Sequence, residues 1–216
     1  MKALLQPLFD WYFEALKTYG YWAVGLMMAA ESTIFPIPSE VIIPPAAHLA
    51  WTEGLNFMGT HLSGWSGQIV LVIAGTLGSW IGATIMYWVS RVAGRPLVMR
   101  YGKYFLVPAS KVEGAERWTA QFGAYGIFAS RLLPVVRHLI GIPAGIVRMN
   151  YLKFSLYTLL GSGLWCGVLC WLGINVGADI NKGEMHKVTF WLVGFLMVVG
   201  VMYYFFVHRH MKAAQK

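Results

Sequence analysis

The chain has 216 residues, of which 57% are hydrophobic and only 12% are charged, and its mean hydropathy is +0.57. Because soluble domains carry about a quarter charged residues, this composition excludes an ordinary soluble protein and predicts an integral membrane protein. The net charge of +8 does not indicate nucleic-acid binding, because the basic residues gather in a few connecting segments, as in loops that set membrane topology.

Residues 2–17 mix charged side chains with apolar and aromatic ones at helical spacing. This pattern predicts an interfacial helix that lies on the bilayer. Asp10 and Glu14 interrupt the first twenty residues, so we expect no cleavable signal peptide.

The next segment, residues 18–52, holds two carboxylates, Glu31 and Glu40, in an otherwise apolar sequence. The uncharged run before Glu31 would rise only about 20 Å as a helix, against a hydrocarbon core of about 30 Å. Breaks in the helical geometry are expected at four prolines, Pro36, Pro38, Pro44 and Pro45. Broken backbone at membrane depth persists where protein buries it, so a re-entrant helix-break-helix hairpin is favoured over the alternative, one kinked span.

Residues 62–90 carry no charge, are long enough to cross a bilayer and contain glycines that permit close helix packing. The loop at 91–117 contains six basic residues and only two acidic ones. The positive-inside rule therefore places this loop in the cytoplasm.

The second half begins with an expected amphipathic helix at 109–122 and continues into an apolar segment, 124–148, that Arg131 and Arg137 interrupt. We interpret this segment as a second re-entrant hairpin. Residues 154–178 and 188–207 are uncharged and predict two further spans, and the tail after them is basic. The crossing count and the charge bias both place the C-terminus in the cytoplasm.

The order of interfacial helix, broken hairpin and span thus occurs twice, in repeats at about 1–94 and about 108–178. Short segments support the likeness, since Tyr19-Gly-Tyr-Trp-Ala23 resembles Phe122-Gly-Ala-Tyr-Gly126. One crossing separates the copies, so they would enter from opposite faces as an inverted repeat. The predicted fold is an all-α polytopic membrane protein, a single membrane domain over 1–216 with an extra transmembrane helix at 188–207.

Four ionisable groups, Glu31, Glu40, Arg131 and Arg137, fall within the two broken segments. An ionised side chain at the bilayer centre costs about 2.5–3.5 kcal/mol, so these groups need a reason to be there. One reason is a purely structural clamp between a glutamate and an arginine, and another is that the arginines reach the membrane surface. The functional interpretation has Arg131 and Arg137 hold a lipid phosphate, while Glu31 and Glu40 carry protons.

Other reactive residues give weaker signals. His48 and His138 could assist proton transfer, whereas Cys166 and Cys170 are interpreted as core packing. Since no nucleophile with a base and no metal-ligand set occurs at usable spacing, we expect no catalytic residue, no metal and no cofactor.

Two segments resemble the signatures of the DedA family of bacterial membrane proteins, also described as the VTT or SNARE-associated domain. The first is Glu31-Ser-Thr-Ile-Phe-Pro-Ile-Pro-Ser-Glu40, and the second is Ser130-Arg131-Leu-Leu-Pro134-Val-Val-Arg137, followed by Pro143-Ala-Gly145 and Met149. The resemblance implies an inner-membrane protein with two opposed re-entrant hairpins, and we expect Pro36, Pro38, Pro134, Pro143 and Gly145 to shape them.

For function, the resemblance implies movement of lipids between leaflets. The implied substrates are undecaprenyl phosphate or a phospholipid such as phosphatidylethanolamine, with coupling to protons or sodium. Glu31, Arg131 and Arg137 match positions on which family function depends, while some members carry an aspartate further along the first hairpin than Glu40. The alternatives are a small-molecule or ion antiporter that uses the same glutamates, a lipid phosphatase or transferase, and a scaffold that transports nothing.

Overall fold

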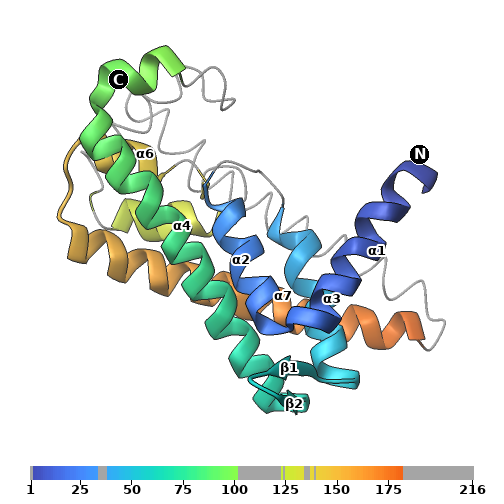
Figure 1. The fold of residues 1–216 in the computed structure, drawn as a ribbon. Coiled ribbons are helices and arrows are strands. Elements are labelled where there is room, and N and C mark those ends of the chain that lie inside the picture. The colour runs from blue at the N-terminus through green and yellow to red at the C-terminus, as the bar shows by residue number, and fades with distance from the viewer. Residues whose placement is uncertain are drawn as a thin grey trace.

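The computed structural model describes residues 2–33, 38–101, 123, 125–133, 137–138 and 140–181, and the chain is mostly helical (Figure 1). The elements in chain order are α1 (Lys2–Tyr19), α2 (Tyr21–Glu31), α3 (Ser39–Thr52), β1 (Leu55–Phe57), β2 (Thr60–Leu62), α4 (Gly64–Tyr101), α6 (Gly141–Ile146) and α7 (Tyr151–Asn181). Residues 125–131 are also helical. The predicted helix at 109–122, most of the basic loop and the span at 188–207 lie outside the described residues.

Two helices of the described part are long and apolar enough to cross a membrane, over Gly64–Val92 of α4 and Tyr151–Gly177 of α7. These candidate spans agree with the predictions at 62–90 and 154–178. Each helix exposes apolar side chains at four-residue intervals: Ile69, Ile73, Leu77, Ile81 and Ile85 on α4, and Leu152, Leu156, Leu160, Leu164 and Val168 on α7. Large exposed apolar surfaces are rare on soluble proteins, so these rows indicate faces that contact lipid.

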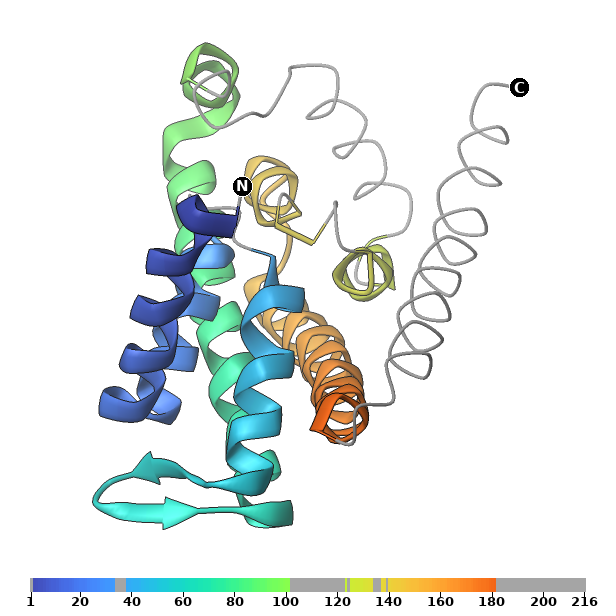
Figure 2. The ribbon, with the colours of Figure 1, turned by 90° about the vertical axis from the view of Figure 1, so that its right-hand side faces the viewer.

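Helices α2 and α3 form a helical hairpin beside α4 (Figure 2). The first residue of α2, Tyr21, donates its hydroxyl hydrogen to the Leu62 carbonyl at 3.0 Å, and α3 leads directly into β1. The outer ends of α2 and α3 therefore both lie at the small β-hairpin, while the break between the two helices lies at the opposite end.

The prediction that four prolines break the first segment is wrong for Pro44 and Pro45, which lie inside α3. Their missing N–H groups leave α3 without two internal hydrogen bonds. Packing compensates: α3 is held between α4 and α7, and Tyr12 of α1 donates its hydroxyl hydrogen to the Ile42 carbonyl in this part of α3. Pro38 has extended backbone just before α3 and fits the predicted break, whereas Pro36 lies outside the described residues.

The strands β1 and β2 were not predicted, so the chain is not purely α-helical. They pair antiparallel from Leu55 with Leu62 to Phe57 with Thr60. The two turn residues, Met58 and Gly59, have φ of 51° and 90°, as a tight hairpin turn with left-handed backbone requires. Asn-Gly is the usual signal for this turn, and a methionine in the first position concealed it.

Helix α4 packs against α2, α3, α6 and α7 and forms the centre of the molecule. Glycines permit the close approach. A Cβ on Gly78 would collide with the backbone of Gly25 in α2, and one on Gly145 of α6 would collide with the backbone of Tyr87. Small residues at such crossings let helices pack through dispersion contacts in lipid. These contacts position the C-terminal end of α2 opposite the segment that carries Arg131 and Arg137.

Candidate functional site

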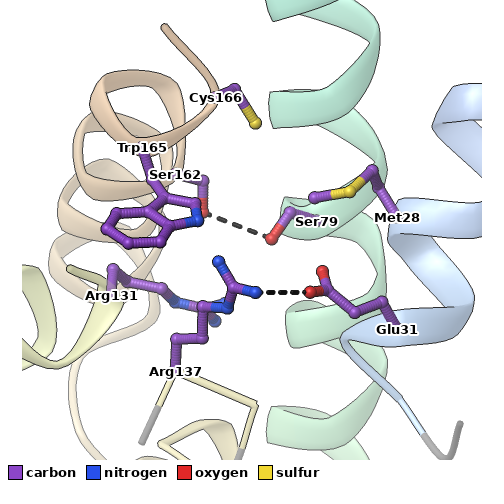
Figure 3. Close-up of a pocket in the computed structure, with 8 residues that line it drawn as sticks. All are labelled: Met28, Glu31, Ser79, Arg131, Arg137, Ser162, Trp165 and Cys166. Carbon is purple, nitrogen blue, oxygen red and sulfur yellow. Dashed lines mark hydrogen bonds and ion pairs between the residues drawn. The ribbon is translucent and has the colours of Figure 1, made fainter. Parts of the chain in front are cut away.

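A small cavity lies where the C-terminal end of α2 faces the segment that carries Arg131 and Arg137 (Figure 3). It is lined by Met28, Glu31, Ser79, Arg131, Arg137, Ser162, Trp165 and Cys166. These side chains come from α2, α4, α7 and the segment that follows residue 125. The cavity leaves about 10 Å³ for the centre of a water molecule, which is room for about one water.

Arg137 forms a buried ion-pair network with both glutamates. Its Nη2 lies 2.8 Å from Oε1 of Glu31 and 3.1 Å from Oε2 of Glu40. The backbone N–H of Ser39 donates to the same Glu31 oxygen at 2.9 Å. Because Ser39 begins α3, Glu31 also lies at a helix N-terminus, where the helix dipole favours a carboxylate. Glu31 is 2% exposed, so the paired arginine and this amide replace the water that a carboxylate would otherwise bind.

The rest of the Arg137 guanidinium has unused hydrogen-bonding capacity. Among the described residues, its ion pairs all use Nη2, and the buried Nε and Nη1 have no hydrogen-bond partner. The guanidinium lies over the ring of Trp165, 5.2 Å from the ring centroid, and the Trp165 indole N–H donates to the Ser39 hydroxyl at 3.2 Å. Trp165 therefore contacts one face of the guanidinium, and its ring does not engage the Nε and Nη1 donors, which lie in the plane of the group.

Arg131 lies on the same cavity and is 2% exposed. Its aliphatic stem packs closely against Gly161 of α7, where a Cβ would meet it at 2.6 Å. The Arg131 Nε is buried without a hydrogen-bond partner, and no ion pair with a carboxylate is found for it among the described residues. A buried donor without a partner costs about 1–3 kcal/mol, so two guanidinium groups here carry donors whose acceptor is still to be identified.

A chain of three buried serines runs along the other side of the cavity. The hydroxyl of Ser79 on α4 lies 3.0 Å from that of Ser32, just after α2, and 3.3 Å from that of Ser162 on α7. Sequence reasoning did not select these residues, because a serine in an uncharged span resembles an ordinary small packing residue. Their proximity depends entirely on how α2, α4 and α7 cross.

Three of the four charged residues predicted for the site, Glu31, Arg131 and Arg137, line the cavity, and the fourth, Glu40, pairs with Arg137. Arg137 joins Glu31 to Glu40, so the pairing that the sequence left open is made by Arg137 among the described residues. Arg131 is the second cation of the cavity. The two carboxylates and two guanidinium groups balance one another in formal charge.

The histidines and cysteines that gave weaker signals in the sequence lie at different places relative to the cavity. The His138 Nδ1 lies 3.9 Å from Glu31, while the His48 ring packs against Gly177 and does not line the cavity. Cys166 and Cys170 both belong to the apolar core, as expected, and Cys166 also lines the cavity. Within the described ranges, no group of three or more histidine, cysteine or acidic side chains is placed to hold a metal.

Of the residues expected to shape the second hairpin, Pro143 and Gly145 lie in α6 and are buried. Gly145 permits the close contact between α6 and α4 described above. Pro134 lies outside the described residues.

The chain was compared with protein families and with known proteins. The model of the VTT domain matches residues 37–175. The undecaprenyl phosphate transporter A of Bacillus subtilis (strain 168) is 32% identical over 216 residues, which cover 100% of both chains. The protein of that name in Staphylococcus aureus is 28% identical over 89% of this chain and 91% of its own.

A relative from Lactococcus lactis subsp. lactis carries the name alkaline phosphatase-like protein. It is 36% identical over 76% of this chain and 74% of its own length. No solved structure matches the chain. The names of the relatives therefore suggest two kinds of chemistry, lipid-phosphate transport and phosphate-ester hydrolysis.

Proposed function

Because the chain belongs to the DedA family, whose signature is the VTT domain, we propose that it moves a phosphate-bearing lipid between the two leaflets of a membrane. The observation that carries this proposal is the set of unpaired guanidinium donors on a buried cavity between lipid-facing helices. Undecaprenyl phosphate is the favoured substrate, because two relatives, matched over 100% and 91% of their lengths, bear its name. A phospholipid such as phosphatidylethanolamine is the other candidate.

The chemistry of the cavity suits a phosphate group. Arginine keeps its charge in an apolar setting and presents a planar fork of donors that matches two oxygens of a phosphate. In Arg137 the two edges that form such a fork both include Nη2, which contacts the glutamates, while Nε and Nη1 have no hydrogen-bond partner among the described residues and can each donate to a phosphate oxygen. Arg131 adds a second guanidinium on the same cavity, so one phosphate would satisfy donors from both arginines.

The lipid chain has a favourable path outside the helices. The exposed apolar rows of α4 and α7 each provide a hydrocarbon-like surface on a helix that also lines the buried cavity. We propose that the head group enters the cavity while the hydrocarbon chain stays against this surface. This division avoids moving the long apolar part of the substrate through a polar site.

Charge balance supports coupling to protons. The two glutamates already offset the two arginines, so an arriving phosphate would leave the buried site with excess negative charge. Excess charge in a low-dielectric site is costly, and a proton taken up by Glu31 restores the balance. Glu31 is the stronger candidate because it is buried, whereas the Glu40 side chain is 26% exposed and closer to water.

The membrane arrangement that goes with this function is two opposed re-entrant hairpins in an inner membrane, with a cytoplasmic C-terminus. It is supported for the first hairpin by the outer ends of α2 and α3, which both reach the β-hairpin. We propose the second hairpin around residues 124–148 from the opposite face, as the inverted order of repeats at 1–94 and 108–178 requires.

The test is leaflet exchange of labelled undecaprenyl phosphate and labelled phosphatidylethanolamine in vesicles that contain the purified chain. The Arg131→Ala/Arg137→Ala double variant should abolish exchange of the true substrate. Lys153→Ala is the matched control, because it removes an exposed positive charge at the start of α7 outside the cavity. Equal exchange in the wild type and the double variant would contradict the proposal.

The same vesicles separate the rival functions. An antiporter predicts cation efflux driven by a pH gradient and no lipid movement. Since one group of relatives has a phosphatase-like name, release of inorganic phosphate is measured in parallel. Phosphate release that depends on Arg131 and Arg137 would identify an enzyme, whereas lipid exchange with intact phosphate identifies a transporter.

A further inference from the structure

The serine chain beside the two arginines has one hydroxyl hydrogen more than it can use. Ser32, Ser79 and Ser162 carry three hydroxyl hydrogens and share two hydrogen bonds. All three residues are at least 95% buried. One hydroxyl hydrogen therefore remains unused. It can belong to Ser32, but in the other two arrangements of the hydrogen bonds it belongs to Ser79 or Ser162, and both of these residues line the cavity.

Among the described residues, the unsatisfied donors therefore belong to three groups that line the cavity. Arg137 supplies Nε or Nη1, Arg131 supplies Nε, and the serine chain on α4 and α7 supplies an O–H. Figure 3 shows the two guanidinium groups and the two cavity serines around one space. A tetrahedral group with three terminal oxygens can accept from all three groups and direct its single remaining bond outward.

We propose that the Ser79 and Ser162 hydroxyls complete the head-group site and make it selective for a phosphate monoester over a phosphodiester. This inference rests on the proposed function, because it takes the cavity to receive a lipid phosphate. A diester has only two terminal oxygens, so it leaves one group of donors unpaired. Its second substituent must also fit beside buried polar groups in a cavity that has room for about one water.

The contact that must open for the head group to enter is the hydrogen bond between Ser79 and Ser162. A phosphate is larger than the cavity, so α4 and α7 have to separate slightly at this level. The two hydroxyl oxygens lie 3.3 Å apart, longer than the usual O–H···O distance of about 2.7–2.8 Å, so this bond is weak. Oxygens of a phosphate monoester would replace it with shorter, charge-assisted hydrogen bonds.

The test compares two probes with the same hydrocarbon chain, farnesyl phosphate and farnesyl methyl phosphate. Binding of each to the purified full chain in detergent is measured by isothermal titration calorimetry. We expect the wild type to bind the monoester at least about tenfold more tightly, because each hydrogen bond to a charged group contributes about 1.5–3 kcal/mol. The Ser79→Ala/Ser162→Ala variant should lose most of this preference, with diester affinity changed by less than about threefold.

Two further variants keep the result interpretable. Ser162→Cys preserves the side-chain size and replaces the hydroxyl by a weaker donor, so it should fold and show an intermediate preference. Ser155→Ala removes another buried α7 hydroxyl, one that accepts the Trp80 indole N–H and does not line the cavity, and it should keep the full preference.

The outcomes distinguish the inference from the function on which it rests. A wild type that binds neither probe would overturn the proposed function itself. A wild type that binds both probes equally, or serine variants that retain the preference for the monoester, would overturn the selective role of the serines and leave the proposed function standing.

Discussion

The substitution Arg137→Lys tests whether the site recognises phosphate by the geometry of a guanidinium rather than by charge alone. In the structure, one nitrogen of Arg137 makes every contact with Glu31 and Glu40. The ammonium of a lysine can take over those contacts with its three donors. The ion pairs, and with them the fold around the break, should therefore persist.

What lysine cannot replace is the Nε and Nη1 donors, which have no hydrogen-bond partner among the described residues. One hydrogen bond from either nitrogen to a charged phosphate is worth about 1.5–3 kcal/mol. Even the lower value corresponds to a loss of about tenfold in an affinity or a rate. We expect the free energy of unfolding to change by less than about 1.5 kcal/mol, because the buried carboxylates keep a cationic partner.

The assay is leaflet exchange of labelled undecaprenyl phosphate in vesicles, with thermal unfolding of the same preparations. Arg91→Lys is the matched control, since Arg91 lies over Tyr87 and Trp88 on α4, outside the cavity. Arg137→Ala provides the opposite contrast, because an unpaired buried glutamate should cost about 3–5 kcal/mol of stability. Exchange by Arg137→Lys within about twofold of the wild-type rate would refute recognition by the Arg137 guanidinium, because the loss expected from even one missing hydrogen bond to a charged phosphate is larger.

Three other substitutions or labels give independent predictions. Glu31→Gln keeps an oxygen for the α3 amide but cannot take up a proton, so its lipid exchange should no longer respond to an imposed pH gradient; a normal response would remove Glu31 from proton coupling. Gly78→Ala should lower the free energy of unfolding by about 1–3 kcal/mol because its Cβ meets the backbone of α2, whereas Gly167→Ala, with nothing within 4 Å, should be neutral or stabilising in the same denaturation assay. Farnesyl phosphate should slow alkylation of Cys166, which lines the cavity, and leave Cys170 unaffected; equal protection of both thiols in mass spectra would indicate a general tightening of the fold.

The two spans could be predicted from the sequence because long uncharged apolar runs have few alternatives to a membrane-crossing helix. Both predictions agree with α4 and α7 within a few residues at their starts. The charged residues of the site could be selected for a related reason, since a charge in an apolar segment is costly unless it has a partner. Glu31, Glu40, Arg131 and Arg137 stood out on that basis alone.

The conformational preferences of single residues did not predict the structure at two places, helix α3 and the β-hairpin. Pro44 and Pro45 each remove a helical donor, yet α3 continues through both because its neighbours hold it in place. The β-hairpin escaped prediction because Met58 occupies a turn position where asparagine or glycine is the usual signal. For α3, the contacts that hold the helix come from elements distant in the sequence, whereas the β-hairpin pairs neighbouring residues through an unusual turn sequence.

The sequence by itself determined that this chain lies in a membrane and that two acidic and two basic residues need partners there. Only the tertiary structure decided that Arg137 joins both glutamates, that Arg131 remains on the cavity without a carboxylate partner among the described residues, and that three serines line up beside them. The physical reason is that these contacts join residues up to 106 positions apart. Their geometry depends on where glycine contacts allow the helices to cross, and residue spacing along one helix carries no information about that crossing.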